Sequence, residues 1–504
     1  MKQYDDIVVG SGISGMTLAL LLGLNGHSVL LLEKQPRIGG SMARFRRKRI
    51  PFDTGFHFTG GFYKNGILHD MLTVLGIGDL IKPVYVSRER DNRLVFEAEQ
   101  AAYDLPTGYQ ATIAKMKDYF PSDAKAIDRY FEMVESVCLR TVGMDLRKIT
   151  LPSGFLDEDY VSLDEVLNGL TENSTLKGIL AGYSMCYGVR PAEISFANHS
   201  RVSYGLYHSV ARVEDGGDAF IRAFEQRAVD LDIEIMPGAY IAECADIRDR
   251  RIGRFVLNTG EELSCDHCIF TIHPHEILKT LPRAHVSKAF VDRVSDFEPS
   301  VGIFSVYGVV GSDDSSDDTE DSFGPSLLSL FPISDINRLM DPRHEGDQAL
   351  LVTRNLERAG DKVHSVVNAC EVSFVENLEG WKESKSGKRP ADYSEYKERR
   401  VERIRERIIS VYGEYRDSYQ VLDAATPLTF RDYLNSPDGS AYGVKQKIGQ
   451  FNLFGRLPLR NAYAAGQSSL LPGLVGAMMS SFIVGRSLVG KESYGGFLKQ
   501  RLEE

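Results

Sequence analysis

Three glycines near the N-terminus stand at a spacing that can hold a dinucleotide. Gly10, Gly12 and Gly15 form a G-x-G-x-x-G pattern, and the acidic Glu33 follows about twenty residues later. The first glycine of such a motif permits a tight turn, the second lets the backbone approach a pyrophosphate, and the third lets a helix pack close to a strand. A carboxylate at Glu33 can accept hydrogen bonds from ribose hydroxyls and repels a 2′-phosphate, so the spacing predicts a dinucleotide other than NADP.

A strand, a helix and a second strand must hold these residues in place. Residues 6–10 are a short β-branched run that ends at glycine, which predicts a buried strand. Residues 16–24 predict a helix, and residues 28–32 predict the second strand. The turn with Ile13 and Ser14 leads into the N-terminus of this helix, which offers free N–H groups and the positive end of the helix dipole to the phosphates.

The segment directly after Glu33 favours FAD over NAD. It reads Lys34-Gln-Pro-Arg37-Ile-Gly39-Gly40-Ser41. This segment resembles the R-x-G-G segment of the FAD-dependent oxidoreductases of the amine oxidase and phytoene desaturase superfamily. The resemblance implies that FAD is the cofactor, that the segment contacts it, and that the glycine pair provides a second close approach of the backbone.

Two C-terminal segments, Gly466-Gln467 and Gly473-Leu474-Val475, resemble further cofactor contacts of this superfamily. There, a strand that ends in Gly-Asp approaches the ribityl chain. Gln467 replaces the usual Asp, which keeps a hydrogen-bonding group but removes the charge. The next helix is implied to point its N-terminus at the flavin ring, where its positive end would stabilise the anionic reduced flavin. The position of Ile241 is implied to touch adenine.

Two more segments narrow the resemblance. Phe52-Asp53-Thr-Gly55-Phe-His57 resembles the D-x-G-x-H segment of the phytoene desaturase, carotenoid isomerase and retinol saturase group, and residues 423–443 resemble its T-P-L-T … G-s-x-Y-G stretch. The resemblance implies cofactor contacts at Asp53 and Gly55. It also makes His57 and Tyr442 candidates for catalysis, although each of them can equally serve only to pack and to hydrogen-bond.

The group implies redox or isomerisation chemistry at carbon–carbon bonds of a long hydrophobic isoprenoid or polyene. Such a substrate has no leaving group and no acidic proton, so the expected step is hydride exchange between a C–H bond and flavin N5. The sequence has no second G-x-G-x-x-G motif, which argues against a dedicated nicotinamide domain. We therefore expect an external electron donor or acceptor, such as oxygen, a quinone or a reductant.

The expected fold is α/β, with a discontinuous Rossmann-like FAD-binding domain and an inserted mixed α/β substrate domain. Residues 1–65, 205–280 and 445–504 are assigned to the FAD-binding domain. Residues 66–204 and 281–444 are assigned to the substrate domain, where a polyene would need an apolar tunnel lined by aromatic side chains.

Two alternatives stay open. An amine oxidase-like flavoenzyme commonly frames the flavin with an aromatic cage, but Trp381 is the only tryptophan and no cage can be assigned. A non-catalytic protein of the GDP-dissociation-inhibitor type would bind a prenylated partner without flavin. The intact glycines and Glu33 argue against that loss of the cofactor.

Other clusters of reactive side chains predict little. His273-Pro274-His275 is not expected to bind a metal, because no carboxylate or further histidine is expected to join the two imidazoles as a ligand. Cys265 and Cys268 form a C-x-x-C spacing, but no second pair exists and the residues appear in a strand pattern.

The composition, the N-terminus and one basic segment bear on where the protein is expected to act and on what it is expected to bind. The chain has 504 residues with 59 Lys+Arg and 70 Asp+Glu, so its net charge is −11 and nucleic-acid binding is not expected. The N-terminus does not resemble a secretory signal, which favours the cytoplasm. The basic run Arg44-Phe-Arg46-Arg47-Lys48-Arg49 is either a solvated strand or a contact for anionic lipid at a membrane surface.

Overall fold

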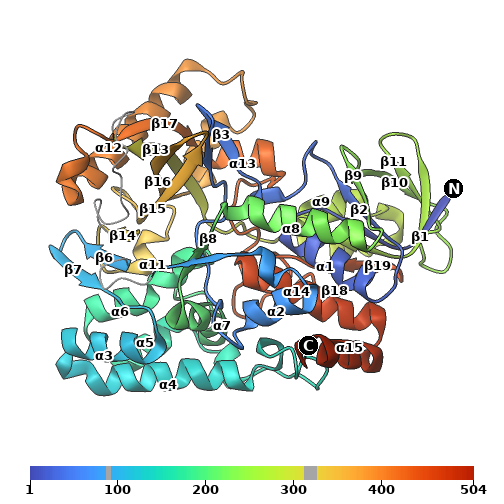
Figure 1. Cartoon of the computed structure of the whole chain (residues 1–504), viewed down its shortest axis with the longest axis horizontal. Helices are drawn as coiled ribbons and strands as arrows, with labels where there is room; N and C mark the ends of the chain where they lie inside the picture. The colour runs from blue at the N-terminus through green and yellow to red at the C-terminus, as the bar shows by residue number, and fades with distance from the viewer. Residues whose placement is uncertain (87–91, 312–325, 504) are drawn as a thin grey trace.

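The computed structural model describes residues 1–86, 92–311 and 326–503, and within them two large β-sheets lie side by side (Figure 1). The first sheet has β1 and β2 at its centre and runs in the order β10-β11-β12-β1-β2-β9, with β19 paired to β12 and β18 paired to β19. Its strands are β1 (Lys2–Val9), β2 (Val29–Glu33), β9 (Glu234–Pro237), β10 (Ile241–Ala245), β11 (Arg254–Leu257), β12 (Glu262–Phe270), β18 (Gly455–Arg456) and β19 (Ala462–Ala464).

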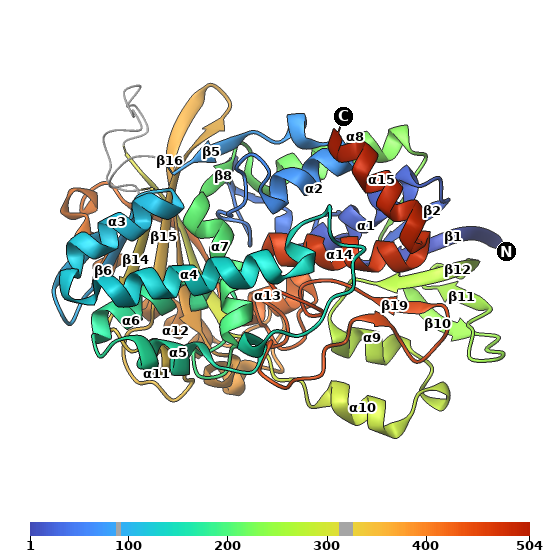
Figure 2. The same ribbon diagram turned by 90° about the horizontal axis from the view of Figure 1, so that it is seen from below.

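The centre of this sheet is parallel and buried on both faces. β1 pairs in parallel with both β2 and β12, and β12 pairs in parallel with β19. One face packs against α1 (Ile13–Leu24), α2 (Ile67–Leu75), α8 (Gly216–Asp230), α14 (Gly473–Val489) and α15 (Lys491–Glu503). The other face packs against α9 (Pro274–Thr280) and α10 (Lys288–Ser295), as Figure 2 shows. Helices on both faces explain why the end of β1, Ile7 to Val9, and the first four residues of β2 are continuous apolar runs in the sequence.

The second sheet runs in the order β17-β13-β16-β15-β14-β6-β7. Its strands are β6 (Asn92–Phe96), β7 (Ala101–Asp104), β13 (Gly302–Val310), β14 (Leu327–Phe331), β15 (Leu350–Ala359), β16 (Lys362–Ser373) and β17 (Gln420–Ala425). The pairs are antiparallel apart from β6 with β14. Alternate side chains of β13 and β14, such as Phe304 and Leu328, pack under α12 (Ala391–Val411).

A helical layer covers the other side of the second sheet (Figure 1). It contains α3 (Tyr109–Tyr119), α4 (Ala124–Arg140), α5 (Leu163–Leu170), α6 (Ser174–Ala181), α7 (Phe196–His208) and the short α11 (Ile336–Leu339). The two halves are connected through the hairpin of β3 (Phe45–Arg47) and β4 (Ile50–Phe52), the pair of β5 (Pro83–Tyr85) and β8 (Ala211–Val213), and α13 (Pro427–Leu434).

Strands of the first sheet come from the beginning, the middle and the end of the chain, and strands of the second sheet come from the intervals between them.

The packing of two helices differs from the domain boundaries expected from the sequence. α2 and α10, which those boundaries assign to the substrate domain, pack in the hydrophobic clusters of the first sheet. Cys265 and Cys268 lie buried within β12. Within the described residues, no helix has both the length and the apolar character needed to cross a bilayer.

Candidate functional site

A cavity of about 1720 Å³ extends from the glycine motif of the first sheet to the inner face of the second sheet. Sites for single small molecules usually measure about 300–1,000 Å³, so this cavity has room for a large cofactor together with a second molecule. We call the end at the first sheet the cradle and the end at the second sheet the chamber. Gly10, Gly12 and Gly40 line the cradle, whereas Leu94 and Phe331 line the chamber.

The glycines of the cradle have different physical roles. Gly10 adopts φ +99°, which favours glycine, and a Cβ atom on Gly15 would stand 1.9 Å from the carbonyl oxygen of Gly10. Gly15 therefore allows α1 to approach β1. A Cβ atom on Gly12 would meet no atom within 4 Å, because Gly12 faces the open cavity. This open backbone is what a pyrophosphate needs for a close approach.

The second glycine segment packs directly on the first. The backbone N–H of Gly39 donates to the carbonyl oxygen of Ser11 at 3.1 Å, and a Cβ atom on Gly40 would lie 3.2 Å from Gly12 Cα. Gly39 and Gly40 have φ values of +115° and +54°. The two loops thus form one surface, and the next residue, Ser41, lines the cavity.

Two helix N-termini open into the cavity. α1 begins after Gly12 and α14 begins after Pro472, and neither helix has a side-chain cap or an acidic residue in its first turn. Their free N–H groups and positive dipole ends are available to an anionic ligand. Hydroxyl contacts hold the helices together, since Ser14 Oγ lies 2.7 Å from Ser481 Oγ.

Glu33 ends β2 at the wall of the cradle. Its carboxylate accepts hydrogen bonds from the backbone N–H groups of Ser11 and Gln35 at 3.0 and 2.8 Å. These bonds hold the side chain at the carboxyl end of the sheet, where a ligand binds in this class of fold. Nearby, Lys34 lies over the ring of Tyr240 at 5.8 Å, and both of these residues line the cavity.

Most of the residues predicted to bind the cofactor line this cavity. They are Gly10, Gly12, Ile13, Ser14, Glu33, Lys34, Arg37, Gly40, Ser41, Gly55, Ile241, Gly466, Gln467, Gly473, Leu474 and Val475. Gly15, Gly39 and Asp53 do not line it. The two glycines pack behind its wall, as described above for Gly15, and the position of Asp53 requires a correction. Direct contact of any of these residues with a cofactor stays a prediction.

Asp53 lies in a buried ion cluster behind the cavity wall. Its two carboxylate oxygens contact Arg44 Nε at 2.9 Å and Arg212 Nη2 at 3.1 Å, and Arg44 also contacts Glu357 at 2.5 Å. Burial raises the pKa of Glu357, although the neighbouring Arg44 opposes this shift. The prediction that Asp53 touches the cofactor did not anticipate these partners. The same cluster removes Arg44, with a side chain only 3% exposed, from the basic surface expected at residues 44–49.

Apolar and aromatic side chains surround the chamber. On each strand, every second side chain points toward the chamber, because residues two apart on one strand share a face. Leu327, Ser329 and Phe331 of β14 line the cavity, whereas Leu328 and Leu330 face α12. From the helical layer and the neighbouring strands, further lining residues are Leu94, Leu105, Met116, Ile179, Leu180, Tyr183, Met185, Leu206, Tyr207, Leu350, Leu351 and Val372.

A hydrogen-bonded network stiffens the wall of the chamber behind these side chains. The ring nitrogens of His199, on α7, lie 2.6 Å from the Tyr130 hydroxyl and 2.8 Å from the Tyr187 hydroxyl. Tyr130 also contacts the hydroxyl of Tyr207, which lines the cavity. Complete burial lowers the pKa of His199 to about 3, so the imidazole is neutral. This network was not anticipated from the sequence.

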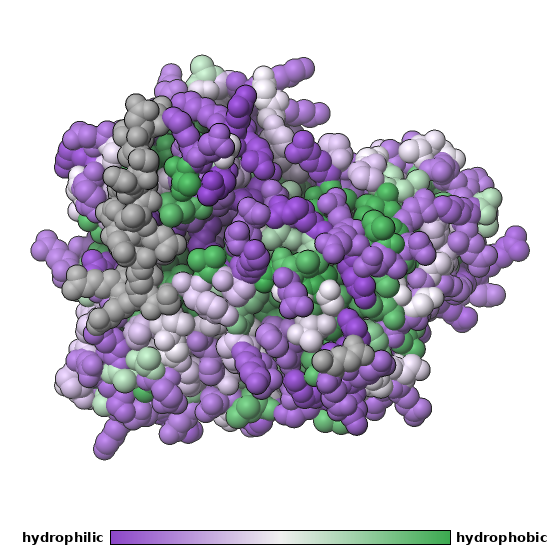
Figure 3. Space-filling model, viewed as in Figure 1, coloured by the Kyte–Doolittle hydropathy of each residue, from purple (hydrophilic) through white to green (hydrophobic). Residues whose placement is uncertain are grey.

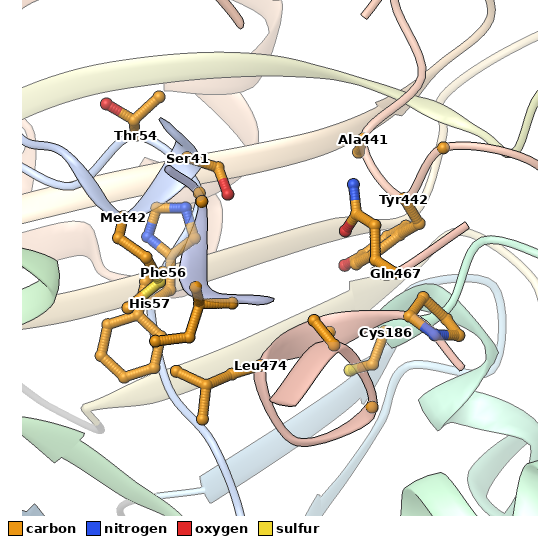
Figure 4. Close-up of a pocket in the computed structure, with 18 of the residues that line it drawn as sticks. Ser41, Met42, Thr54, Phe56, His57, Cys186, Ala441, Tyr442, Gln467 and Leu474 are labelled. Carbon is orange, nitrogen blue, oxygen red and sulfur yellow. The ribbon is translucent and has the colours of Figure 1, made fainter. Parts of the chain in front are cut away.

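His57 and Tyr442, the two candidates for catalysis, both line the cavity. In the view of Figure 4, His57 lies beside Phe56 and Met42, and Tyr442 lies beside Gln467 on the opposite side. Burial raises the pKa of the Tyr442 hydroxyl well above its ordinary value, so this group stays protonated. Whether either residue takes part in catalysis stays a prediction.

Two neighbours of predicted residues were missed because they are remote in the sequence. Cys370 on β16 also lines the cavity, and its Sγ lies 3.4 Å from His57 Nε2.

Asp438 lies 3.2 Å from His273, and together with His275 these side chains form a group that could hold a metal ion. The expectation that no carboxylate accompanies the two histidines is therefore wrong. Nevertheless, His273 Nδ1 accepts from the His275 N–H, and His275 Nε2 contacts the carbonyl oxygen of Val294, so hydrogen bonds already occupy these nitrogens.

Comparison with protein families supports the fold of the first sheet. Residues 8–74 match a domain described as an NAD(P)-binding Rossmann-like domain. The expected Rossmann-like α/β fold and the binding of a dinucleotide-type cofactor are thereby confirmed.

Similar proteins cover nearly the whole chain. The all-trans-retinol 13,14-reductase of Danio rerio is 24% identical over 97% of this chain and 86% of its own length. Prolycopene isomerase 2, chloroplastic, of an Oncidium hybrid cultivar is 28% identical over 30% of this chain and 25% of its own length. The expected resemblance to the phytoene desaturase, carotenoid isomerase and retinol saturase group is confirmed, and so is the expectation of an oxidoreductase.

Solved structures show the same fold at lower identity. An oxidoreductase from Methanosarcina mazei superposes with a TM-score of 0.65 at 15% identity, over 95% of this chain and 99% of that one. A putrescine oxidase bound to putrescine superposes with a TM-score of 0.61 at 13% identity, over 96% of this chain and 98% of that one. At these identities the superpositions show the shared architecture only.

Proposed function

Because this oxidoreductase is related to the phytoene desaturase, carotenoid isomerase and retinol saturase group, we propose that it is an FAD-dependent enzyme of carbon–carbon bonds. Its substrate is a hydrophobic polyene or isoprenoid. The reaction is desaturation, saturation or isomerisation by hydride exchange with the flavin.

One observation carries this proposal: the cradle and the chamber are two ends of a single cavity. The cradle offers two uncapped helix N-termini and an open glycine backbone, which suit a dinucleotide. The chamber offers apolar strand faces and tyrosines, which suit a long hydrocarbon. A substrate bound in the chamber therefore lies against whatever part of the cofactor reaches the junction.

The residues of the cradle fit FAD. Gly12 and the first turn of α1 would hold the pyrophosphate, Glu33 and Ile241 would hold the adenosine end, and Gln467 would hold the ribityl end. FAD supplies the exchange of a hydride at N5 when it is bound. The chain binds and orients both molecules, and its apolar chamber excludes water from the junction.

The first experiment is a spectrum of the purified protein followed by conversion assays. We expect a bound flavin spectrum, and conversion of a C20–C40 polyene panel, detected by chromatography and mass spectrometry of lipid extracts. Putrescine serves as the control substrate for the amine oxidase alternative. A colourless protein that does not take up added FAD would refute the proposal, and oxidation of putrescine without polyene conversion would favour the alternative.

The electron partner is external in this proposal. A reductase needs a reductant to recharge the flavin, and a desaturase needs oxygen or a quinone to discharge it. The protein is first reduced anaerobically and is then mixed with a quinone or with oxygen. Reoxidation by either acceptor restores the flavin absorbance and so tests this proposal.

We also propose a cytoplasmic location with peripheral contact to a membrane. Two surfaces support it. One surface is the basic run, where Arg46, Lys48 and Arg49 are exposed. The other is the segment after α4, where Phe155 is 82% exposed and Tyr160 is 63% exposed. The segment is close to the cavity, since the neighbouring residues Leu139, Met144 and Lys148 line it. It crosses the face seen in Figure 2.

On the face seen in Figure 3, which is turned by 90° from the view of Figure 2, hydrophobic residues gather over α2 and α8 at the seam between the halves, within a mostly hydrophilic surface. Sedimentation with anionic vesicles compares the candidate contacts. We expect replacement of Arg46, Lys48 and Arg49 by Ser to weaken binding in a salt-dependent manner, and Phe155→Ser to weaken it at any salt concentration. Unchanged binding by both variants, or no binding by the wild type, would reject the membrane contact.

A further inference from the structure

We propose that Cys370 and His57 form a proton-exchanging pair that acts on the substrate at the junction of the cradle and the chamber. This inference rests on the proposed function and adds the acid–base half of the reaction. It also gives His57 a chemical partner that its own sequence motif does not contain.

The geometry brings the two side chains together from distant parts of the chain. His57 lies in the loop after β4, and Cys370 lies on β16, opposite Ser305 of β13. Cys370 Sγ is 3.4 Å from His57 Nε2 and 3.9 Å from Ser305 Oγ. All three residues line the cavity, and the buried Nδ1 of His57 has no hydrogen-bond partner among the described residues.

The surroundings favour an ion pair of thiolate and imidazolium. Burial by itself would raise the pKa of the Cys370 thiol, but the charge and the hydrogen bond of His57 outweigh it, and the pKa is lowered. Burial by itself would lower the pKa of His57, but Cys370 outweighs it and the pKa is raised. The two shifts agree in sign with a proton that moves from the sulfur to the ring.

Other titratable groups face this pair from the elements packed against it. The charge of Asp53 favours the imidazolium and opposes the thiolate, whereas Arg212 opposes the imidazolium. Asp53 and Arg212 are paired with each other, so much of their effect cancels. Tyr307 and Tyr442 also lie near Cys370, and burial raises the pKa of both hydroxyls, so these groups stay neutral.

The pair supplies the proton that hydride exchange alone does not provide. Saturation of a carbon–carbon double bond adds a hydride with its two electrons to one carbon, and the reduced flavin is its source. The other carbon takes a proton from the pair, which is left with one proton fewer and recovers it from water. Desaturation reverses each transfer, so the pair accepts the proton. In both directions, atoms and electrons balance with the flavin and one proton.

Cys186 provides a matched control because it lines the same cavity (Figure 4) and, within the part of the chain that the structure describes, no histidine shifts its pKa. Burial raises the pKa of the Cys186 thiol to about 12. The two cysteines share the cavity but differ in their partner, and of the two only Cys370 has a thiol pKa that is lowered.

The first test measures the thiols without any turnover. Purified protein is alkylated with iodoacetamide from pH 5 to pH 10, and the rate at each cysteine is followed by peptide mass spectrometry. We expect Cys370 to react well below pH 8 and Cys186 to react only at the alkaline end, since an ordinary thiol has a pKa of about 8.5. His57→Gln should move the Cys370 profile to higher pH. An ordinary profile for Cys370 that His57→Gln does not change would overturn the pair.

The second test measures proton transfer. Cys370→Ser and Cys370→Ala should keep the flavin spectrum but lower polyene conversion by about 10²- to 10⁴-fold, which is typical for loss of a general acid–base group. Cys244→Ser, a change on β10 at a residue that does not line the cavity, should convert at the wild-type rate. In heavy water, wild-type saturation should place deuterium on the substrate carbon that takes the proton. Wild-type conversion by both Cys370 variants would reject the proton-exchange role. A wild type that converts no polyene would instead refute the proposed function, and the alkylation profile would still decide whether the pair exists.

Discussion

The cradle and the chamber are built in different ways although they share one cavity. The cradle is made of backbone: the positive φ of Gly10, the open face of Gly12 and two uncapped helix starts. The chamber is made of side chains that come from many strands and helices, such as Ser329, Val372 and Tyr183. A site built from backbone needs positions that carry no side chain. A site built from side chains depends on which residues occupy its wall.

This difference explains what each end can recognise. A backbone surface at a helix N-terminus binds phosphate through N–H groups and a dipole, and these do not depend on the identity of a side chain. An apolar chamber selects by shape and length, and a single substitution in its wall changes both. The cradle therefore indicates the cofactor class, and the chamber decides the substrate.

The largest expected effect concerns the ion cluster at the seam between the two ends. Asp53→Ala leaves Arg44 and Arg212 without their shared carboxylate in a buried place, so we expect a loss of about 3–5 kcal/mol in the free energy of unfolding. The control is Asp423→Ala, which removes the partner of the half-exposed Arg47 and should cost about 1 kcal/mol or less. Urea unfolding measures both variants, and equal losses would mean that the cluster does not hold the seam.

The next effect separates two glycines of the cradle. Gly15→Ala puts a Cβ atom against the Gly10 carbonyl, so we expect the free energy of unfolding of the cofactor-free protein to fall by about 3 kcal/mol. Gly12→Ala has open space and should cost about 1 kcal/mol or less, yet lower the affinity for the dinucleotide at least about tenfold. Thermal unfolding and FAD titration distinguish these effects. Equal destabilisation by both substitutions would contradict the assignment of one glycine to packing and the other to the ligand.

A pH-dependent effect belongs to the chamber wall. The folded protein keeps His199 neutral down to about pH 3, whereas the unfolded chain protonates it near the ordinary histidine pKa of 6.5. Its contribution to stability is therefore complete above about pH 6.5 and is lost as the pH falls, by about 1.4 kcal/mol per pH unit, or about 2 kcal/mol at pH 5. His199→Gln should remove this part of the slope in urea unfolding at pH 7, 6 and 5. A variant with the wild-type slope would show that other groups cause the acid sensitivity.

The smallest effect tests the chamber alone. Ser329→Phe adds a ring to the cavity face of β14, so we expect polyene conversion to fall about tenfold, or about 1.4 kcal/mol, with an unchanged flavin spectrum. Ser329→Ala keeps the space and should convert normally. If Ser329→Phe also released the flavin, the two ends could not be treated as separate sites.

The sequence predicted the cradle well because its signals are local. The helix expected at residues 16–24 is observed as α1, from Ile13 to Leu24, and the strand expected at residues 28–32 is observed as β2, from Val29 to Glu33. In each case a glycine, a cap or an apolar run within a few residues sets the element.

The errors concern charged and reactive groups whose partners are remote. Asp53 was expected at the cofactor and lies in an ion cluster, because Arg212 is brought to it by β8. Asp438 stands beside His273 although 165 residues separate them. No spacing rule links such pairs, because a folded contact between distant residues depends on the path of the whole chain.

What the sequence alone determined is the glycine motif of the cradle with Glu33 after its second strand, and the resemblance of further short motifs indicated the group of oxidoreductases. Those features depend on residue types at short spacing, and short-range backbone conformation follows from residue type. The tertiary structure alone decided that cradle and chamber share one cavity, that Asp53 is buried away from it, and that Cys370 meets His57. The physical reason is that sheet register and layer packing place these groups together, and both arise only when distant segments bury their apolar faces against one another.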